Sequence, residues 1–573
     1  MSVTSAQKTS LSDKPIWLFL LCWTIFNAIQ AYTLEVHADE AYYWMYSKFL
    51  DWGYFDHPPM VAIFIWLGDQ LVHNEFGLRL VTILSSSTAI YLLWLMLKKY
   101  AVNAWPFILV VSGVFIIHLY GFTTTPDAPL FFFTVLFYYL YQKYITDDSW
   151  LLALLIGIVI ACLLYSKYHA VLVIFLTLAS NIKLLQRRTF WGIVVFALIL
   201  FIPHILWQVQ HDFPSLKYHL YDRSATHYNP ENSWLYIPGQ LLMAGPLIGW
   251  FLYYSAFKIN IKDAFIRCLV VNCVGALLFF FLSTFRGEAQ PHWTLIAFAP
   301  LAMLALIRFN QNGIPRWFYS LAIINLCLIV FIRISVMLDL PFISRVGQIK
   351  SYFGYKEWAQ KVKAKAGDSY MIMSDGFQDP SKYNFYTNSI RAYSYDSKIY
   401  RHTQYDIWPI EEQFQGKRVY FMQDAPTPAT ADTITNTSTH NKWYAEWVGS
   451  TRTYQKINIE TEVHQLHLQG NKKSVIALTL TNPYNYPVSF SNKGQKQLVA
   501  LEACFYKDDV NRYVITADNS FNNLILKPGE SKRFDFALTT PPLAKCKYEL
   551  LFSIRTTPFF GGKNSRIISV TIE

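Results

Sequence analysis

Long apolar segments separated by short polar ones occupy the first two thirds of the chain. The runs from Ile16 to Leu34 and from Trp191 to Trp207 each approach the ~20 mostly apolar residues that an α-helix needs to cross ~30 Å of hydrocarbon. Such runs recur as far as Met337 and then stop. We therefore predict a polytopic α-helical membrane protein with about eleven spans. They lie at about residues 16–34, 76–97, 104–121, 128–144, 150–165, 169–185, 190–207, 235–257, 266–284, 292–308 and 317–337.

The pattern changes after the last apolar run. Residues 345–460 combine an amphipathic stretch with short β-rich runs such as Arg418 to Met422, which predicts an α/β domain. From residue 461, alternating strands separated by Asn-Pro, Pro-Gly and Pro-Pro turns predict a β-sandwich over 461–573. These two domains would follow a membrane domain at 1–340 that has a long outer loop at 35–75.

The composition and the distribution of charge agree with a membrane protein. Of the 573 residues 53% are hydrophobic and 15% are charged, whereas charged residues make up about 25% of ordinary soluble domains. The net charge of +11 would suggest nucleic acid for a soluble protein. Here the Lys and Arg residues gather in alternate loops, which indicates orientation in a membrane and no nucleic-acid partner. The loops expected in the cytoplasm hold Lys98, Lys99, Lys143, Lys183, Arg187, Arg188, Lys258, Lys262, Arg267, Arg308 and Arg316.

This asymmetry predicts an integral protein of a bacterial inner membrane with its N-terminus in the cytoplasm. An odd number of spans takes the chain after Met337 to the outer face, so both C-terminal domains are expected in the periplasm. Only Lys8 and Lys14 precede the first apolar run, without a convincing cleavage site, and we expect this first helix to be retained.

The cysteines fall into two groups. Five lie in or beside apolar runs, where inert small core residues are expected. Cys504 and Cys546 lie on predicted strands of the domain that we expect to be exported. Because an oxidising compartment favours disulfides, we predict a bond between them across the β-sandwich.

Candidate chemistry begins in the outer loop at 35–75. It contains His37-Ala38-Asp39-Glu40-Ala41-Tyr42-Tyr43-Trp44, whose two adjacent carboxylates need compensation if they are partly buried at the mouth of a membrane helix. A solvated acidic loop end is the alternative. Further along, Asp56-His57-Pro58-Pro59 places an acid and an imidazole that could bind a metal or a phosphate before a rigid backbone. A turn before an interfacial helix would use the same prolines.

Other polar groups lie at the expected outer ends of the spans. Asp127 begins a strongly apolar run, where a helix cap and a functional acid look alike. Four groups break the positive-inside pattern, and together they could hold a lipid-linked phosphate, although snorkelling to headgroups would explain each one. They are Lys167, His169, Arg286 and His292.

These motifs, in this order, resemble those of bacterial membrane glycosyltransferases related to protein O-mannosyltransferases and to the aminoarabinose transferases that modify lipid A. The resemblance spans roughly residues 15–340. Its most specific stretches are Asp39-Glu40-Ala41-Tyr42-Tyr43-Trp44, Trp52-Gly53-Tyr54-Phe55-Asp56-His57-Pro58-Pro59-Met60, Gly77-Leu78-Arg79-Leu80, Thr125-Pro126-Asp127-Ala128-Pro129-Leu130, Ser166-Lys167-Tyr168 and Pro291-His292-Trp293.

The resemblance implies a C-type glycosyltransferase fold, a sugar donor on a polyprenyl or dolichyl monophosphate, and an active site at the outer face of the membrane that the protein spans. It also implies that Asp39 acts as general base in the mannosyltransferase branch, while Asp127 organises the site. In the aminoarabinose branch the acceptor is an ionised lipid phosphate, so Asp39 would orient it or balance charge. Where those transferases have Glu-Lys before the paired prolines, this chain has Asp56-His57.

We therefore expect a single inverting displacement, in which the acceptor attacks the anomeric carbon opposite the departing polyprenyl phosphate. The acceptor would be lipid A or lipopolysaccharide, or another envelope glycan, with protein O-mannosylation as the alternative. A transporter or flippase of lipid-linked sugars is the competing class. The expected catalytic residues are Asp39, Glu40 and Asp127, the phosphate ligands are His57, Lys167, Arg286 and His292, and Asp56 would bind a divalent metal ion.

Overall fold

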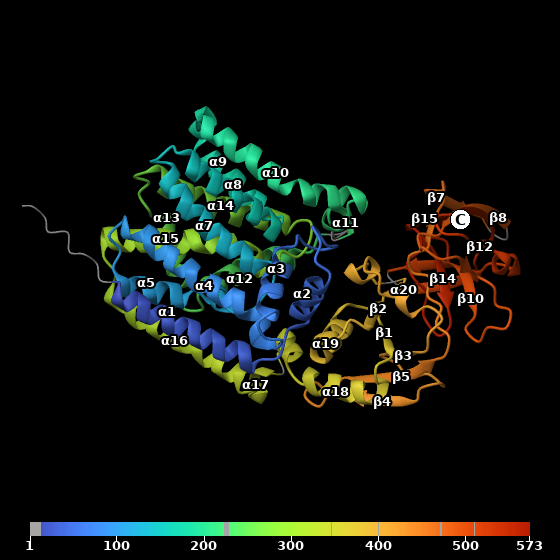
Figure 1. The fold of residues 1–573 in the computed structure, drawn as a ribbon. Helices are drawn as coiled ribbons and strands as arrows, with labels where there is room; N and C mark the ends of the chain where they lie inside the picture. The colour runs from blue at the N-terminus through green and yellow to red at the C-terminus, as the bar shows by residue number, and fades with distance from the viewer. Residues whose placement is uncertain (1–12, 223–227, 345, 399, 470–472, 509) are drawn as a thin grey trace, which may run out of the picture. The chain divides into compact units, whose positions relative to one another are not determined.

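The computed structural model describes residues 13–222, 228–344, 346–398, 400–469, 473–508 and 510–573 (Figure 1). Two compact units divide the chain, Met1–Phe353 and Gly354–Glu573. The first is helical, and the second mixes helices with strands in its first half and consists mainly of strands in its second.

Helices make up the first unit. They are α1 (Lys14–Thr33), α2 (Ala38–Lys48), α3 (Met60–Asp69), α4 (Glu75–Lys98), α5 (Ala104–Gly113), α6 (Phe115–Tyr120), α7 (Asp127–Tyr144), α8 (Trp150–Ser166), α9 (Ala170–Ser180), α10 (Arg188–Gln210), α11 (Pro214–Lys217), α12 (Pro230–Ala244), α13 (Gly249–Phe257), α14 (Ala264–Ser283), α15 (Leu295–Asn312), α16 (Arg316–Met337) and α17 (Pro341–Ser344). Short 3-10 or π turns lie at Ile182–Gln186, Tyr218–Asp222, Pro291–Thr294 and Gly347–Tyr352.

Six helices in the described part of the chain are long and apolar enough to cross a bilayer, namely α1, α4, α10, α14, α15 and α16. A seventh span results if α12 and α13, which meet at a bend of 94°, count as one. The predicted polytopic helical protein is confirmed. Each of the eleven predicted segments contains a helix, but α5 and α9 are too short to cross alone, so the number eleven stays a prediction.

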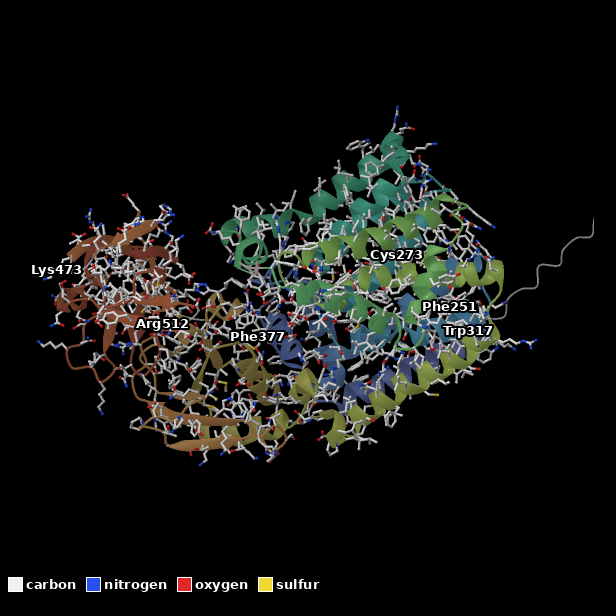
Figure 2. All side chains as sticks on the ribbon, turned by 180° about the vertical axis from the view of Figure 1, so that it is seen from behind. Phe251, Cys273, Trp317, Phe377, Lys473 and Arg512 are labelled. Atoms are coloured by element: carbon white, nitrogen blue, oxygen red, sulfur yellow. The ribbon has the colours of Figure 1, made fainter. Side chains whose placement is uncertain are left out.

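Burial distinguishes the helices of this bundle. In α15 83% of the apolar window is buried, whereas in α10 only 22% is, because α10 presents large apolar side chains outward. Aromatic contacts join neighbouring helices: the rings of Phe251 on α13 and Trp317 on α16 are 4.7 Å apart (Figure 2). An apolar outer surface of this kind suits a lipid environment.

The outer loop predicted at 35–75 is largely helical. Its first part forms α2, which begins with a capping box. The His37 side chain accepts a hydrogen bond from a backbone N–H of the first turn, and the Glu40 side chain accepts one from the backbone N–H of His37. Its second part forms α3, which starts directly after Pro58 and Pro59. The turn before an interfacial helix, given above as the alternative for these prolines, is therefore present.

A five-stranded sheet forms the first half of the second unit. Its order is β2-β1-β3-β5-β4, with β1 (Tyr370–Ser374) parallel to both β2 (Ala392–Tyr395) and β3 (Val419–Gln423). The strands β4 (Asp432–Thr435) and β5 (Lys442–Val448) are antiparallel additions. The helices are α18 (Tyr355–Ala366), α19 (Gln378–Thr387) and α20 (Glu411–Phe414).

The second half of this unit contains mixed β-sheets, as the alternating pattern predicted. The order β11-β10-β14-β15-β7 describes one sheet and β13-β8-β6 another, and β12 pairs with β9. Side chains from both larger sheets share one core, for example Leu478, Phe536 and Phe552. The strands are β6 (Asn458–Glu460), β7 (Gln465–Leu468), β8 (Lys473–Thr481), β9 (Val488–Ser489), β10 (Val499–Lys507), β11 (Val510–Thr516), β12 (Ile525–Leu526), β13 (Ser531–Thr539), β14 (Lys547–Thr556) and β15 (Ile568–Ile572).

The predicted disulfide between Cys504 and Cys546 is wrong, because both cysteines are free. Antiparallel pairing of β10 with β14 places Cys504 opposite Leu551, five residues beyond Cys546. At ~3.3 Å per residue this offset separates the two cysteines by roughly 16 Å along the strand. A disulfide requires Cα atoms within ~7 Å.

Candidate active site

The adjacent acids Asp39 and Glu40 lie in the first turn of α2 and differ completely in environment. The Asp39 side chain is 44% exposed and its carboxylate lies 3.6 Å from the His37 ring. The Glu40 side chain is fully buried. Successive residues on a helix point about 100° apart, so only one of the two carboxylates reaches the open side.

Glu40 pairs with Arg79 of α4. Arg79 Nε donates to Oε1 at 2.8 Å and a terminal nitrogen donates to Oε2 at 2.5 Å. Backbone nitrogens of Thr124 and His37 donate to the same carboxylate. Burial alone would raise the pKa of Glu40, but the Arg79 charge and these bonds lower it below its usual value. The carboxylate is therefore held as an anion with its acceptor sites occupied.

The remaining N–H groups of Arg79 donate hydrogen bonds to the end of α1. It bonds to the carbonyl oxygens of Ala31, Leu34 and Glu35 at 3.0, 2.6 and 2.9 Å. With the two bonds to Glu40, all five guanidinium N–H groups are used. The pair thus joins α1, α2, α4 and the segment before α7. The buried Glu40 therefore holds other groups in position, and its carboxylate is not open to a substrate.

Asp127 and Lys167 form a second buried ion pair. Lys167 Nζ lies 2.8 and 2.9 Å from the two carboxylate oxygens, and both side chains are buried. Asp127 is the first residue of α7, and Lys167 follows the last residue of α8. Since the structure records no capping bond at the start of α7, the carboxylate serves the pair.

Tyr43, a buried residue of α2, lies within reach of the charges of three carboxylates. Burial raises the pKa of Tyr43 well above its usual value, and the charges of Asp39, Asp56 and Asp127 raise it further. The acids of the three separate motifs thus act electrostatically on one side chain. The structure therefore brings the predicted motifs together.

Imidazole rings complete this cluster. The His57 ring lies 5.7 Å from the Tyr43 ring and 6.2 Å from the ring of His219. His219 Nε2 lies 3.0 Å from the carbonyl oxygen of Asp56, and its ring is 5.6 Å from that of Tyr168. We name Asp39, Tyr43, Asp56, His57, Asp127, Lys167 and His219 the acidic-imidazole cluster.

The sequence prediction missed two members of the site, Arg79 and His219. Arg79 is a charged residue inside an apolar helix, and that exception is a usable signal. His219 lies in a polar connection between α10 and α12, where nothing in the local pattern distinguishes it. Tyr352, after the last span, was also missed: its ring packs 5.0 Å from that of His37.

The two remaining predicted phosphate ligands differ in setting. His292 packs its ring 5.9 Å from that of Tyr120, on which the charges of Asp127 and Asp39 act. Arg286 is exposed in the turn after α14, and none of the contacts among described residues links it to the acidic-imidazole cluster. Arg286 is therefore the weakest of the predicted ligands.

The donor set for a metal ion is poor. Among the described residues no three His, Cys, Asp or Glu side chains are arranged to hold one ion. A site based on Asp56 would need further oxygen ligands, since Mg²⁺ requires near-octahedral oxygen coordination. We derive no step through a metal.

Comparison with known proteins identifies the class of the chain. Residues 56–207 match the family model of dolichyl-phosphate-mannose-protein mannosyltransferases. This segment contains Asp56, His57, Asp127 and Lys167. Over these residues the chain is similar to that family, and its class is that of a membrane glycosyltransferase.

Two relatives extend the comparison of the transferase. A curated relative, the lipid A galacturonosyltransferase RgtD from Rhizobium johnstonii (strain DSM 114642 / LMG 32736 / 3841), is 23% identical over 347 residues, which cover 55% of this chain and 72% of RgtD. The crystal structure of ArnT from Cupriavidus metallidurans in the apo state aligns with a TM-score of 0.57 at 14% identity, over 76% of this chain and 98% of ArnT.

The same ArnT bound to undecaprenyl phosphate aligns with a TM-score of 0.55 at 12% identity, over the same shares of the two chains. At this identity the likeness establishes an ArnT-like fold. Together, these findings confirm the family resemblance and the enzyme class predicted from the sequence.

Proposed function

We propose that the transferase moves a sugar from a polyprenyl monophosphate donor to an envelope lipid or glycan at the outer face of a bacterial inner membrane. The observation that carries this proposal is the acidic-imidazole cluster, in which the partly exposed carboxylate of Asp39 and the buried Asp127–Lys167 pair both neighbour Tyr43. An acceptor hydroxyl needs a base such as a carboxylate, and a leaving phosphate needs a cation. The ArnT structure with undecaprenyl phosphate and the action of RgtD on lipid A support the donor and the acceptor class.

The chemistry is an inverting displacement. An acceptor oxygen forms a bond to the anomeric carbon, and the bond from that carbon to the phosphate oxygen breaks with its electron pair on the phosphate. A hydroxyl acceptor gives its proton to Asp39. A phosphate acceptor is already ionised and gives none, so Asp39 then orients it or balances its charge.

The leaving phosphate needs cations, and the structure limits which ones are suitable. Arg79 is engaged with Glu40 and the end of α1, so it has no donor left for a ligand. Lys167 is held by Asp127 through its ammonium, which still has a third N–H donor. We assign Lys167 and His57 to the phosphate and Asp127 to the positioning of Lys167.

The membrane orientation belongs to the same proposal. The Lys and Arg residues of alternate loops favour a cytoplasmic N-terminus, and this places Asp39 and Lys167 at the outer ends of their helices. Donor sugars would then reach the site from the lipid phase, and the residues after α16 would lie in the periplasm.

The acceptor can be tested by mass spectrometry of envelope lipids, glycans and glycopeptides from a strain that lacks this gene. We expect one lipid or glycan species to lose a single sugar and to regain it with the wild-type gene. The Asp39→Asn gene should not restore it. A sugar lost only from glycopeptides would support the protein O-mannosyltransferase alternative, which the family description favours. An unchanged envelope would contradict the proposal.

A further inference from the structure

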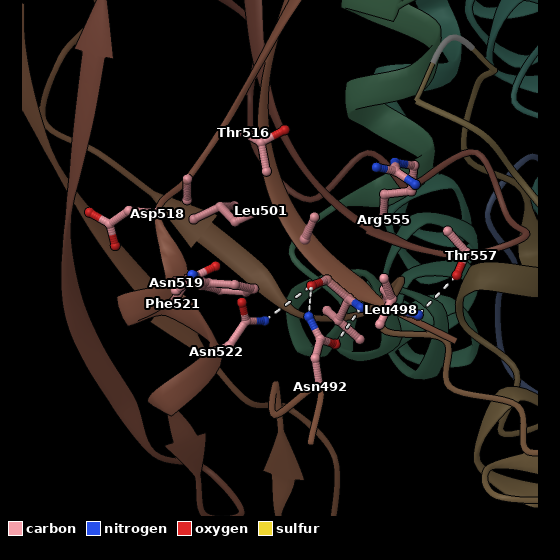
Figure 3. Close-up of a pocket in the computed structure, with 13 residues that line it drawn as sticks. Asn492, Leu498, Leu501, Thr516, Asp518, Asn519, Phe521, Asn522, Arg555 and Thr557 are labelled. Atoms are coloured by element: carbon pink, nitrogen blue, oxygen red, sulfur yellow. Dashed lines mark hydrogen bonds between the residues drawn. The ribbon is translucent and has the colours of Figure 1, made fainter. Parts of the chain in front are cut away.

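A small cavity opens at one end of the C-terminal strands, entirely within the second unit (Figure 3). Its volume is about 210 Å³. It lies where β10 begins, β11 and β14 end, and the short helix Asn519–Asn523 passes between them. The lining residues are Asn492, Leu498, Val499, Ala500, Leu501, Thr516, Ala517, Asp518, Asn519, Phe521, Asn522, Arg555 and Thr557. Loops clustered at the end of a rigid sheet scaffold are a common place for binding sites.

Side-chain amides hold the wall of this cavity in place. Asn492 bonds to both the backbone N–H and the carbonyl of Val499, at 2.8 and 2.9 Å. Asn522 donates to the carbonyls of Val499 and Phe490, at 3.1 and 2.9 Å. The start of β10 is thus fixed from two sides (Figure 3). A wall fixed in this way reduces the ordering entropy that a ligand would otherwise cost.

The lining combines apolar surface with uncharged donors and acceptors. Leu498, Ala500 and Leu501 supply the apolar part, while Thr516 and Asn519 supply exposed polar side chains. Arg555 also lines the cavity, and its Nε donates at 2.6 Å to Glu502, a carboxylate that also pairs with Lys398. Asp518 is the single carboxylate among the lining residues, and it caps the following turn through Ser520.

These properties select the ligand class. A divalent cation would need several oxygen ligands with more than one carboxylate, and a strongly bound inorganic anion would need several cations, whereas Arg555 is the one cationic side chain in the lining. The cavity is also smaller than the ~300–1,000 Å³ of ordinary drug-sized sites. A single sugar ring fits both limits, because its hydroxyls donate and accept and its C–H face can rest on apolar side chains.

We propose that this cavity binds one sugar unit, as a second carbohydrate site separate from the acidic-imidazole cluster. The assignment of a sugar to this cavity follows from the geometry of the cavity alone. Its link to the glycan acceptor rests on the proposed function. A second attachment point for the acceptor would raise its effective concentration at the enzyme without any new contact at the catalytic site.

The test measures sugar binding to the full-length protein in lipid nanodiscs by saturation-transfer NMR. The probes are the methyl glycosides of glucose, galactose, N-acetylglucosamine and galacturonic acid. We expect wild type to bind at least one of them. Thr516→Trp, which fills the cavity from β11, should weaken that binding about tenfold or more, and Asn519→Ala should weaken it as well.

Matched controls separate the cavity from the rest of the unit. Asn511→Trp adds the same side chain at an exposed position of β11 outside the cavity and should leave binding unchanged. Asp39→Asn should also leave it unchanged, so failure of the catalytic proposal and failure of this one are distinguishable. Competition by oligosaccharides of the bound sugar would identify a glycan as the source, and its absence would identify free sugar.

Two results would overturn the proposal. One is the failure of all four methyl glycosides to bind wild type. The other is binding by Thr516→Trp that equals binding by Asn511→Trp, since the sugar would then lie elsewhere.

Discussion

Asp39→Asn is expected to reduce kcat/KM by about 100-fold or more while the protein remains folded and inserted in the membrane. General base catalysis contributes roughly 10²–10⁴-fold, and an amide cannot accept the acceptor's proton. The Asp39 side chain is partly exposed and lies outside the two buried ion pairs, so its loss should not disturb packing. The measurement is sugar transfer by equal amounts of purified wild-type and variant protein, with thermal unfolding as the readout of folding.

The control for this variant is Asp51→Asn in the same outer loop. Asp51 accepts hydrogen bonds from Trp207 Nε1 at 2.8 Å and from the backbone N–H of Trp52 at 2.7 Å. An asparagine oxygen keeps one of them, and Asp51 is not a member of the acidic-imidazole cluster, so activity should change little. Near wild-type transfer by Asp39→Asn would remove Asp39 from the chemistry. An equal loss in both variants would show a general sensitivity of the loop to charge.

The pair formed by Asp127 and Lys167 should give the largest effect on stability. Removing one partner of a buried ion pair leaves an uncompensated charge and typically costs ~3–5 kcal/mol. We expect Asp127→Asn and Lys167→Met each to lower thermal stability strongly and to abolish transfer. The double variant should regain most of the stability, because no buried charge remains, but it should stay inactive because the phosphate loses its cation.

A more exposed pair offers the matched comparison. Lys98 and Asp13 lie 2.6 Å apart with side chains about one third exposed, and Lys98→Met should cost only ~0–1 kcal/mol. Transfer by the double variant at the wild-type rate would contradict the assignment of Lys167 to the phosphate. If Asp127→Asn and Lys167→Met were as stable as Lys98→Met, the burial of the pair formed by Asp127 and Lys167 would be contradicted.

Sequence reasoning predicted the helical membrane unit well because apolar runs of sufficient length have few other uses. Each of its eleven predicted segments contains a helix, but six or seven spans among the described residues are long and apolar enough to cross. It did not show that the segment after Ala104 breaks at Gly113, or that α9 ends at Ser180. At both breaks the backbone carbonyl accepts a hydrogen bond from a distant helix, from Asn325 and from Arg267, which the local pattern does not show.

The candidate site shows a similar limit. The motifs around Asp39, Asp56, Asp127 and Lys167 were found from exceptions to the apolar pattern, and the charges of their three acids act on Tyr43. The different environments of Asp39 and Glu40 could not be predicted from two adjacent positions in the sequence, since they depend on which side of α2 faces Arg79. His219 comes from a distant segment and reaches His57 only through folding.

The error at Cys504 and Cys546 has a geometric cause. The sequence showed that both lie in strand-like segments, but the residues between them allow many strand registers. A shift of five residues between β10 and β14 decides whether two cysteines can bond. Strand register is set by packing across the sheets, which the local pattern does not determine.

The most direct test of the central claim is a transfer assay with purified protein in lipid nanodiscs. The donor is a polyprenyl monophosphate that carries a radiolabelled sugar, and the acceptor is envelope extract from the strain that lacks the gene. Our account predicts that label moves to the extract with equimolar release of polyprenyl phosphate, for wild type and not for Asp39→Asn. Transfer from a nucleotide sugar without any polyprenyl carrier, or no transfer by wild type, would contradict it.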